Sequence, residues 1–107
     1  MLAKVAVESA VFSVDKPYDY LVPKDLESQV FAGQRVIVPF GGGNRKTKGF
    51  ILKLLYAQER GKEKYISHAF DDSVSLSEED MAIALWMRQR YFCTLFEAAS
   101  ALLPPGM

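Results

Sequence analysis

Two apolar runs, the first of them β-branched, lie on either side of a glycine-rich stretch and constrain the fold of this chain most. The runs are Arg35–Val38 and Gly49–Leu52, and three consecutive glycines, Gly41–Gly43, lie between them. Strand-like runs joined by glycines predict a β-hairpin with a long, mobile connection. The tip, Asn44–Lys48, carries three cations within four residues. Such a tip suits a phosphate backbone. From this stretch alone an ordinary exposed hairpin with solvated lysines is favoured, because basic loop tips are common.

Other short strands are expected before and after this hairpin. Alternating apolar residues predict strands over Leu2–Val7 and Tyr18–Val22, and the return strand of the hairpin is expected from about Lys48 to Tyr56. A last short strand is expected over Lys64–Phe70. Two core candidates, Val11 and Phe12, follow the first strand.

Period-two alternation assigns side chains to the two faces of each strand. In the second strand it places Tyr18, Tyr20 and Val22 on one face, and Asp19 and Leu21 on the other. We interpret Tyr20 as a core aromatic. In the return strand the same rule puts three side chains on one face: Phe50, Leu52 and Leu54.

The last third of the chain predicts two helices. Ser77 and Asp80 form a capping-box pattern that starts the first helix. Met81–Met87 is apolar nearly all round, so this helix is expected to be buried on more than one side, with Trp86 in the core. A second helix is expected over Thr94–Leu103. The element order predicts an α+β fold, a twisted or barrel-like antiparallel sheet of about five strands followed by two helices.

Length and composition predict one domain and no enzyme. The 107 residues allow a single modest core, mainly β over residues 1–72 and mainly helical over 73–107. Cys93 and His68 are the only residues of their types, which excludes an intrachain disulfide and a zinc pattern. No phosphate-binding or nucleophile motif and no long apolar span occurs. A linker-like Pro104–Gly106 suggests a piece of a longer protein.

The charges balance overall but are segregated along the chain. The formal net charge is zero, yet residues 44–64 hold seven bases and two acids, and residues 71–80 hold five acids and no base. A local surplus of positive charge attracts a polyanion even when the total is zero. Two solvated patches of opposite sign are the alternative interpretation.

Several elements, taken in order, resemble one family. The chain is similar to the amino-terminal domain of bacterial primosomal replication-restart helicases, the PriA family (primosomal protein N′). The matching elements are Tyr18–Pro23 (YDYLVP), Gly33–Gly41 (GQRVIVPFG), Lys48–Ile51 (KGFI), Lys64, Trp86, Tyr91–Phe92 and Leu103–Pro104. The chain departs from the family in the extra glycines and bases after Gly41, and in Tyr91–Phe92 where a tyrosine pair is usual.

The resemblance implies a non-catalytic domain that captures the 3′ end of the nascent leading strand at a stalled fork. It implies a pocket for the terminal nucleotide formed by four residues: Tyr18, Asp19, Gly41 and Lys64. Phosphate contacts are expected from Arg45, Lys46 and Lys48. The resemblance assigns the ATPase of a 3′–5′ helicase, with ATP, magnesium and zinc, to other domains. The implied partners are DNA with a 3′-hydroxyl end, those domains, primosome proteins and single-strand-binding protein, in the bacterial cytoplasm near the nucleoid and without a membrane.

The chemistry of these residues suits a DNA terminus. An ionised Asp19 can accept a hydrogen bond from a 3′-hydroxyl and would repel a 3′-phosphate. Tyr18 can stack on the terminal base, although on an ideal strand it faces away from Asp19 unless the strand bends after Pro17. Without the resemblance, Asp19 could simply cap the turn at Pro17, and Tyr18 could be a core aromatic.

Two other functions remain open from the sequence. A single-strand-binding barrel of OB type would bind DNA without preferring an end. A protein-interaction domain would dock through the apolar helix Met81–Met87 and bind DNA weakly.

Overall fold

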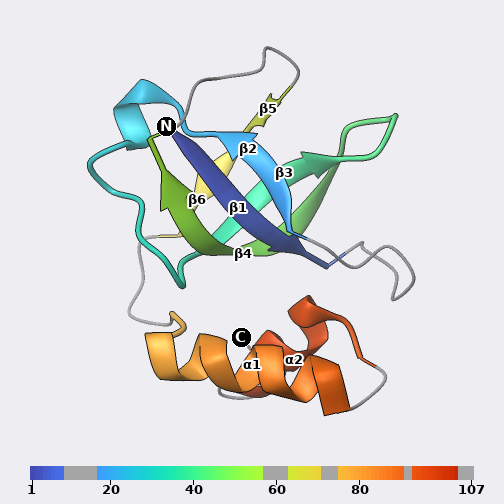
Figure 1. The fold of residues 1–107 in the computed structure, drawn as a ribbon. Helices are drawn as coiled ribbons and strands as arrows, with labels where there is room; N and C mark the ends of the chain where they lie inside the picture. Colours follow the sequence, from blue (N-terminus) through green and yellow to red (C-terminus); the bar gives the residue numbers. More distant parts are fainter. Residues whose placement is uncertain (9–16, 57–62, 71–74, 91–92, 104–107) are drawn as a thin grey trace.

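A curled β-sheet forms one layer of the protein and two helices form the other (Figure 1). The computed structural model describes residues 1–8, 17–56, 63–70, 75–90 and 93–103. The elements are β1 (Leu2–Val7), β2 (Tyr18–Leu21), the 3-10 helix η2 (Lys24–Leu26), β3 (Arg35–Phe40), β4 (Arg45–Leu55), β5 (Lys64–Tyr65), β6 (His68–Ala69), α1 (Glu78–Arg90) and α2 (Leu95–Ala101). The predicted α+β class is confirmed, with six strands in place of about five.

The sheet has the strand order β5-β2-β1-β4-β3-β6, and every pairing is antiparallel except β2–β5. The expected last strand, Lys64–Phe70, is therefore two short strands that pair with opposite edges of the sheet. Between them, Ile66 N donates to Leu21 O at 3.0 Å and Ser67 N donates to Ile37 O at 2.9 Å. One short segment thus joins both edges and closes the curl.

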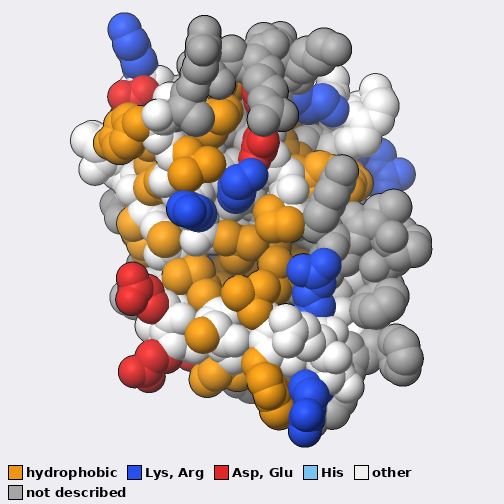
Figure 2. Space-filling view, viewed as in Figure 1, with side chains coloured by type: hydrophobic (Ala, Val, Ile, Leu, Met, Phe, Trp, Pro, Cys, Tyr) orange, Lys and Arg blue, Asp and Glu red, His pale blue; other side chains and the backbone are white. Residues whose placement is uncertain are grey.

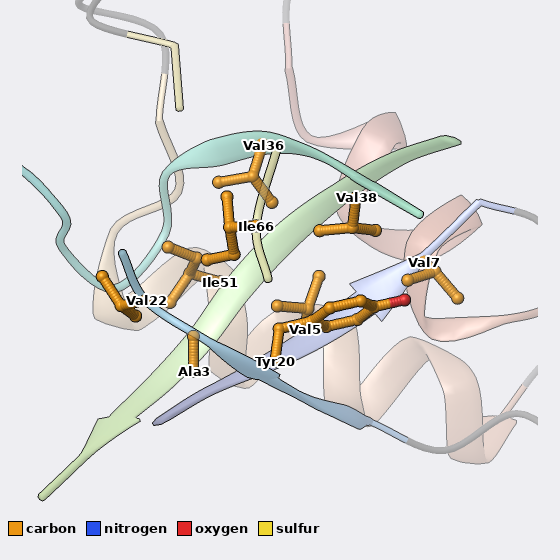
Figure 3. Close-up of a cluster of buried hydrophobic side chains, with 9 residues drawn as sticks. All are labelled: Ala3, Val5, Val7, Tyr20, Val22, Val36, Val38, Ile51 and Ile66. Carbon is orange, nitrogen blue, oxygen red and sulfur yellow. The ribbon is translucent and has the colours of Figure 1, made fainter. Parts of the chain in front are cut away.

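The inner face of the curled sheet encloses the first hydrophobic core (Figure 3). Tyr20 is only 4% exposed, and its hydroxyl donates to Pro39 O at 2.7 Å. Tyr18 and Val22 pack in the same cluster, so the predicted face of β2 is confirmed. The buried members of this core are Ala3, Val5, Val7, Tyr20, Val22, Val36, Val38, Ile51 and Ile66.

A β-bulge in the β1–β4 pairing changes which side chains of β4 face this core. Lys4 pairs with Lys53 but Val5 pairs with Ile51, so β4 holds one extra residue at this point. Each extra residue reverses the alternation beyond it. Leu54 consequently packs against the inner core, while Leu52 packs on the outer side with the helices. The prediction that Leu54 shares a face with Phe50 and Leu52 is wrong for this reason.

The outer face of β1 and β4 carries the second core, under the helices. Ala6 and Phe50 from the sheet pack with Leu95 and Phe96 of α2. Reciprocal capping fixes the start of α2, because Thr94 Oγ1 accepts from Glu97 N at 3.1 Å and Thr94 N donates to Glu97 Oε1 at 2.9 Å. These bonds satisfy backbone donors that a helix start otherwise leaves unpaired.

The start of α1 is as predicted but its burial is not. Asp80 N donates to Ser77 Oγ at 3.0 Å and Ser77 N donates to Asp80 Oδ2 at 3.2 Å, which confirms the capping box. Ala84 is the only buried residue of α1, and Trp86 is 50% exposed. The predictions of a helix buried on several sides and of a core Trp86 are therefore wrong. A two-layer domain of this size offers α1 one packing side only.

The β3–β4 hairpin differs from the expected long loop. Its connection is the four-residue turn 41–44, in which Asn44 N donates to Gly41 O at 3.1 Å. Gly41 and Asn44 have positive φ angles of 77° and 51°, a conformation that favours Gly and Asn. The basic residues assigned to a loop tip instead begin β4, so the prediction of a long connection is wrong. The predicted core residues Val11 and Phe12, and Tyr91–Phe92 and Pro104–Gly106, lie outside the described residues.

Gly33 is the glycine that the fold needs most. It has a φ of +95°, and an added Cβ would overlap the carbonyl oxygen of Leu76. We predict that Gly33→Ala lowers the free energy of unfolding by about 2–4 kcal/mol in urea titrations, from strain and displacement of the backbone. Gly42→Ala is the matched control, because nothing lies within 4 Å of its added Cβ. Equal stability of the two variants would contradict the prediction.

The buried Tyr20 phenol predicts a loss of stability at high pH. Burial, followed by the nearby Tyr18, raises the pKa of Tyr20 to about 12 from 10.0. The folded state therefore keeps a proton that the unfolded state releases, and the stabilisation present below pH 10 falls as the pH rises toward 12. We predict that the urea midpoint of unfolding falls less steeply between pH 10 and pH 12 in Tyr20→Phe than in the unmodified protein. At neutral pH the variant should lose about 1 kcal/mol with the bond to Pro39. Parallel pH curves for the two proteins would exclude this role of Tyr20.

Candidate nucleic-acid interface

An aromatic pair lies where the start of β2 meets the end of β3. The rings of Tyr18 and Phe40 contact edge to face, with centroids 5.1 Å apart and planes at 85°. Both side chains are partly buried against the inner core. The bond from the Tyr20 hydroxyl to Pro39 O, one residue before Phe40, fixes the end of β3 against β2. Phe40 belongs to the recognised sequence elements, but sequence reasoning gave it no separate role.

Lys64 and Gly41 meet next to this pair. Lys64 is the neighbour of Tyr20 in the parallel β2–β5 ladder, and its Nζ donates to Gly41 O at 2.7 Å. Gly41 directly follows Phe40 and is exposed, with no atom within 4 Å of an added Cβ. Open space at this backbone allows a ligand to come close. The structure thus brings three of the predicted pocket residues, Tyr18, Gly41 and Lys64, to one corner of the sheet.

Asp19 points away from this corner. It stays in regular register opposite Lys4 of β1, and Lys4 Nζ lies 2.9 Å from Asp19 Oδ1. The two side chains are 39% and 30% exposed, respectively, so water screens this ion pair. The structure therefore does not bring Asp19 to the face of Tyr18, and the carboxylate pairs with Lys4. Sequence reasoning missed Lys4, whose signal was a lone charge within the apolar run Leu2–Val7.

The three predicted phosphate contacts divide between the two faces of β4. Arg45 is the cross-strand partner of Phe40, whereas Lys46 pairs with Pro39 and Lys48 pairs with Ile37. Directly opposed residues share a face, and neighbours along a strand alternate. Arg45 consequently lies on the side of the aromatic pair, while Lys46 and Lys48 lie on the opposite side. All three side chains are exposed.

The described residues contain no group of three or more His, Cys, Asp or Glu side chains placed to hold a metal ion. Cys93 is a free thiol, and its Sγ lies 3.9 Å from Met87 O. No helix in the described part of the chain is long and apolar enough to span a membrane.

Comparison with known proteins identifies the family. The family model of the PriA 3′ DNA-binding domain (3′BD) matches residues 4–104. The replication restart protein PriA of Bacillus subtilis is 33% identical over 107 residues, and the match covers 98% of this chain. PriA of Rickettsia conorii is 32% identical over 88 residues (82% of this chain), and PriA of Treponema pallidum is 28% identical over 102 residues (88% of this chain).

These relatives are much longer than this chain. The matched region covers 13% of the B. subtilis and R. conorii proteins and 15% of the T. pallidum protein. The family match and the B. subtilis match both extend over nearly all of the 107 residues, and they agree with the resemblance found in the sequence. The chain belongs to the 3′ DNA-binding domain family of the replication restart protein PriA.

Proposed function

We propose that this domain binds DNA and receives the 3′-hydroxyl end of the nascent leading strand at stalled replication forks. Family membership supports DNA binding in replication restart. The proposal of 3′-end capture rests on one observation, the hydrogen bond from Lys64 Nζ to Gly41 O beside Tyr18 and Phe40. It gathers a cation, an accessible backbone and aromatic rings at one corner, which are the components that a terminal nucleotide requires.

The edge of β2 explains how Tyr18 and Asp19 could serve one nucleotide from opposite faces. The β2–β5 ladder begins at Tyr20, so β5 does not extend alongside the two preceding residues. A nucleotide that approaches this edge would meet the Tyr18 ring on one side and the Asp19 carboxylate on the other. This arrangement would need no bend of β2 after Pro17, although the two side chains face opposite ways.

Asp19 is proposed to select a hydroxyl terminus. A carboxylate has about four lone-pair sites, so its bond to Lys4 leaves capacity to accept from a 3′-hydroxyl. A phosphate in the same place would face like charge. Stacking on Tyr18 or Phe40 would contribute roughly 1–3 kcal/mol without reading the base. Lys64 would leave Gly41 O to meet the penultimate phosphate, with Arg45 on the same side of the hairpin.

The wider role is proposed from the relatives. This chain is proposed to act without a catalytic group, as the DNA-binding part of an ATP-dependent 3′–5′ helicase. ATP, magnesium and zinc are assigned to other parts of that protein, and no residue of this chain is proposed to hold them. Its partners would include the other helicase domains, primosome proteins and single-strand-binding protein, in the cytoplasm at the bacterial nucleoid.

The proposed function predicts that the domain distinguishes between DNA ends. We expect fluorescence anisotropy to show tighter binding of a short oligonucleotide with a 3′-hydroxyl than of the same oligonucleotide with a 3′-phosphate. The ratio of dissociation constants should be about tenfold or more, from one charge-assisted hydrogen bond. Asp19→Ala should abolish this ratio and strengthen binding of the 3′-phosphate, because Lys4 loses its partner.

Asp25→Ala is the control, since Asp25 is an exposed acid of η2 on which the proposal places no role. It should keep the ratio of the unmodified chain. Equal binding of both ends by the unmodified chain would reject end capture and favour a general single-strand-binding surface. Absence of binding at any salt concentration would favour a protein-interaction domain.

Charge substitutions on β4 test which of its two faces contacts DNA. Arg45→Gln and Lys64→Gln should each weaken binding and reduce the slope of log K against log salt by about 0.7, as one lost phosphate contact on single-stranded DNA does. Lys46→Gln is the matched control, because Lys46 is adjacent in sequence and also exposed but lies on the opposite face. If Arg45→Gln and Lys46→Gln weakened DNA binding equally, the bound DNA strand would not follow the face of β4 that carries Phe40's partner.

A further inference from the structure

Lys46 and Lys48 are two predicted phosphate contacts that the proposed function leaves unused. Both side chains are exposed, and both lie on the face of β4 opposite to Arg45. Neither lysine forms an ion pair within the part of the chain that the structure describes. The two cations are therefore available to an anionic ligand that approaches this side of the hairpin.

The end of the β3–β4 hairpin is a two-stranded ribbon. The two strands stay paired as far as Phe40 and Arg45. In contrast, β1 pairs with β4 only up to Gly49, and β6 pairs with β3 only at Val36 and Ile37. Figure 1 shows the hairpin turn projecting past the neighbouring strands. The side of the ribbon that faces away from the inner core is therefore not flanked by another described strand.

This outer side of the ribbon continues across β3 onto β6. Ile37 is the cross-strand partner of Lys48 on one side and of His68 on the other, so these three side chains share a face. Arg35 precedes Ile37 by two residues and lies on the same face, where its guanidinium is 5.0 Å from the centroid of the Phe70 ring. The rings of His68 and Phe70 contact edge to face, with centroids 5.0 Å apart. We call this surface the β3 outer face, and its charged and aromatic members are Arg35, Lys46, Lys48, His68 and Phe70.

The β3 outer face carries a surplus of positive charge. It holds three cations and is bordered by one acid, Glu8, whose backbone N donates to Lys48 O at 2.9 Å. On the outer face of β1 and β2, by contrast, Asp19 is paired with Lys4. Figure 2 shows basic side chains spread over the sheet layer, and acidic side chains gathered at the end of the helical layer where α1 starts. A phosphate backbone is therefore attracted to the β3 outer face more than to the neighbouring surfaces.

We propose that the β3 outer face binds the phosphate backbone of the DNA strand that is paired with the nascent strand. This inference rests on the proposed function and deepens it, because a nascent strand lies on a template, so a second backbone accompanies its 3′ end. Arg45 and Lys46 are neighbours in sequence but lie on opposite sides of the ribbon, so one hairpin can contact both backbones. A DNA major groove, about 12 Å wide, admits a two-stranded β-ribbon. The preferred ligand is then a paired 3′ end.

The spacing of the two lysines fits one continuous DNA strand. Lys46 and Lys48 are two residues apart, which is about 6.8 Å along an extended strand. Each strand of a duplex carries one phosphate per about 3.4 Å of helix axis, so the two ammonium groups can contact nearby phosphates of one backbone. His68, in the same row as Lys48, is exposed and presents a ring N–H that can donate to a further phosphate or sugar oxygen.

Fluorescence anisotropy with two DNA probes tests the proposal on the 107-residue chain. Both probes contain the same labelled strand with a 3′-hydroxyl end, which is single-stranded in one probe and paired with a longer complementary strand in the other. Lys46→Gln/Lys48→Gln should weaken binding of the paired probe about tenfold or more at low salt. For this probe the slope of log K against log salt should fall by about 1.8, as two lost phosphate contacts on a duplex require. Binding of the single strand should change by less than about twofold, since it has no second backbone.

The matched control is Lys24→Gln/Lys53→Gln, which removes the same charge from two exposed lysines outside the β3 outer face. It should leave the binding of both probes unchanged. Equal weakening of the paired probe by the two double variants would overturn the proposal. So would an equal effect of Lys46→Gln/Lys48→Gln on the paired and single-stranded probes, because the lysines would then contact the nascent strand.

A failure of this inference is distinguishable from a failure of the proposed function. If the single strand with a 3′-hydroxyl still binds more tightly than the one with a 3′-phosphate, while Lys46→Gln/Lys48→Gln leaves the paired probe unaffected, only the second-strand contact is rejected. Equal binding of the two single strands by the unmodified chain would reject end capture, and with it this inference.

Discussion

The rest of the structure depends on the hydrogen bonds that the two residues between β5 and β6 donate to β2 and β3. Adjacent amides, those of Ile66 and Ser67, donate to Leu21 O and Ile37 O on strands at opposite sides of the sheet. This closes the curl around Ile66, which is 2% exposed. The same segment carries Lys64 to within 2.7 Å of Gly41 O. Fold closure and the candidate site are therefore consequences of one short stretch of backbone.

Local periodicity predicted the fold well where the sheet is regular. The alternation of Tyr18, Tyr20 and Val22 and the capping box of Ser77 and Asp80 involve residues close together in the chain, which a sequence shows directly. The bulge opposite Lys4 and Val5 depends on how two distant strands pair, so the sequence could not reveal that Leu54 changes face. The apolar sequence of α1 did not predict its burial correctly, for a similar reason. A residue such as Trp86 is buried only if another layer of the protein covers it.

The candidate site was predictable mainly through the order of its elements. The resemblance grouped Tyr18, Gly41 and Lys64, which lie 46 residues apart at most in sequence yet meet at one corner. Spacing alone could not have joined them, because β1 and β4 separate β2 from β3 in the sheet and only its curl brings their ends together. The division of Arg45 from Lys46 and Lys48 required the register of the hairpin, and the pairing of Asp19 with Lys4 required the β1–β2 register.

The balance of charges is consistent with recognition of an end and less so with tracking along DNA. Nonspecific affinity grows with the number of phosphates that cations neutralise, and a strongly basic domain would hold internal backbone in preference to a rare terminus. This chain has zero net charge, and Lys4 of β1 is paired with Asp19 of β2. Under the proposed function, weak attraction to internal phosphates would leave the few contacts at the Gly41 corner to decide the position of binding. The Asp19 carboxylate, which would repel an internal phosphate, would then contribute to the selectivity of this surface for a hydroxyl end.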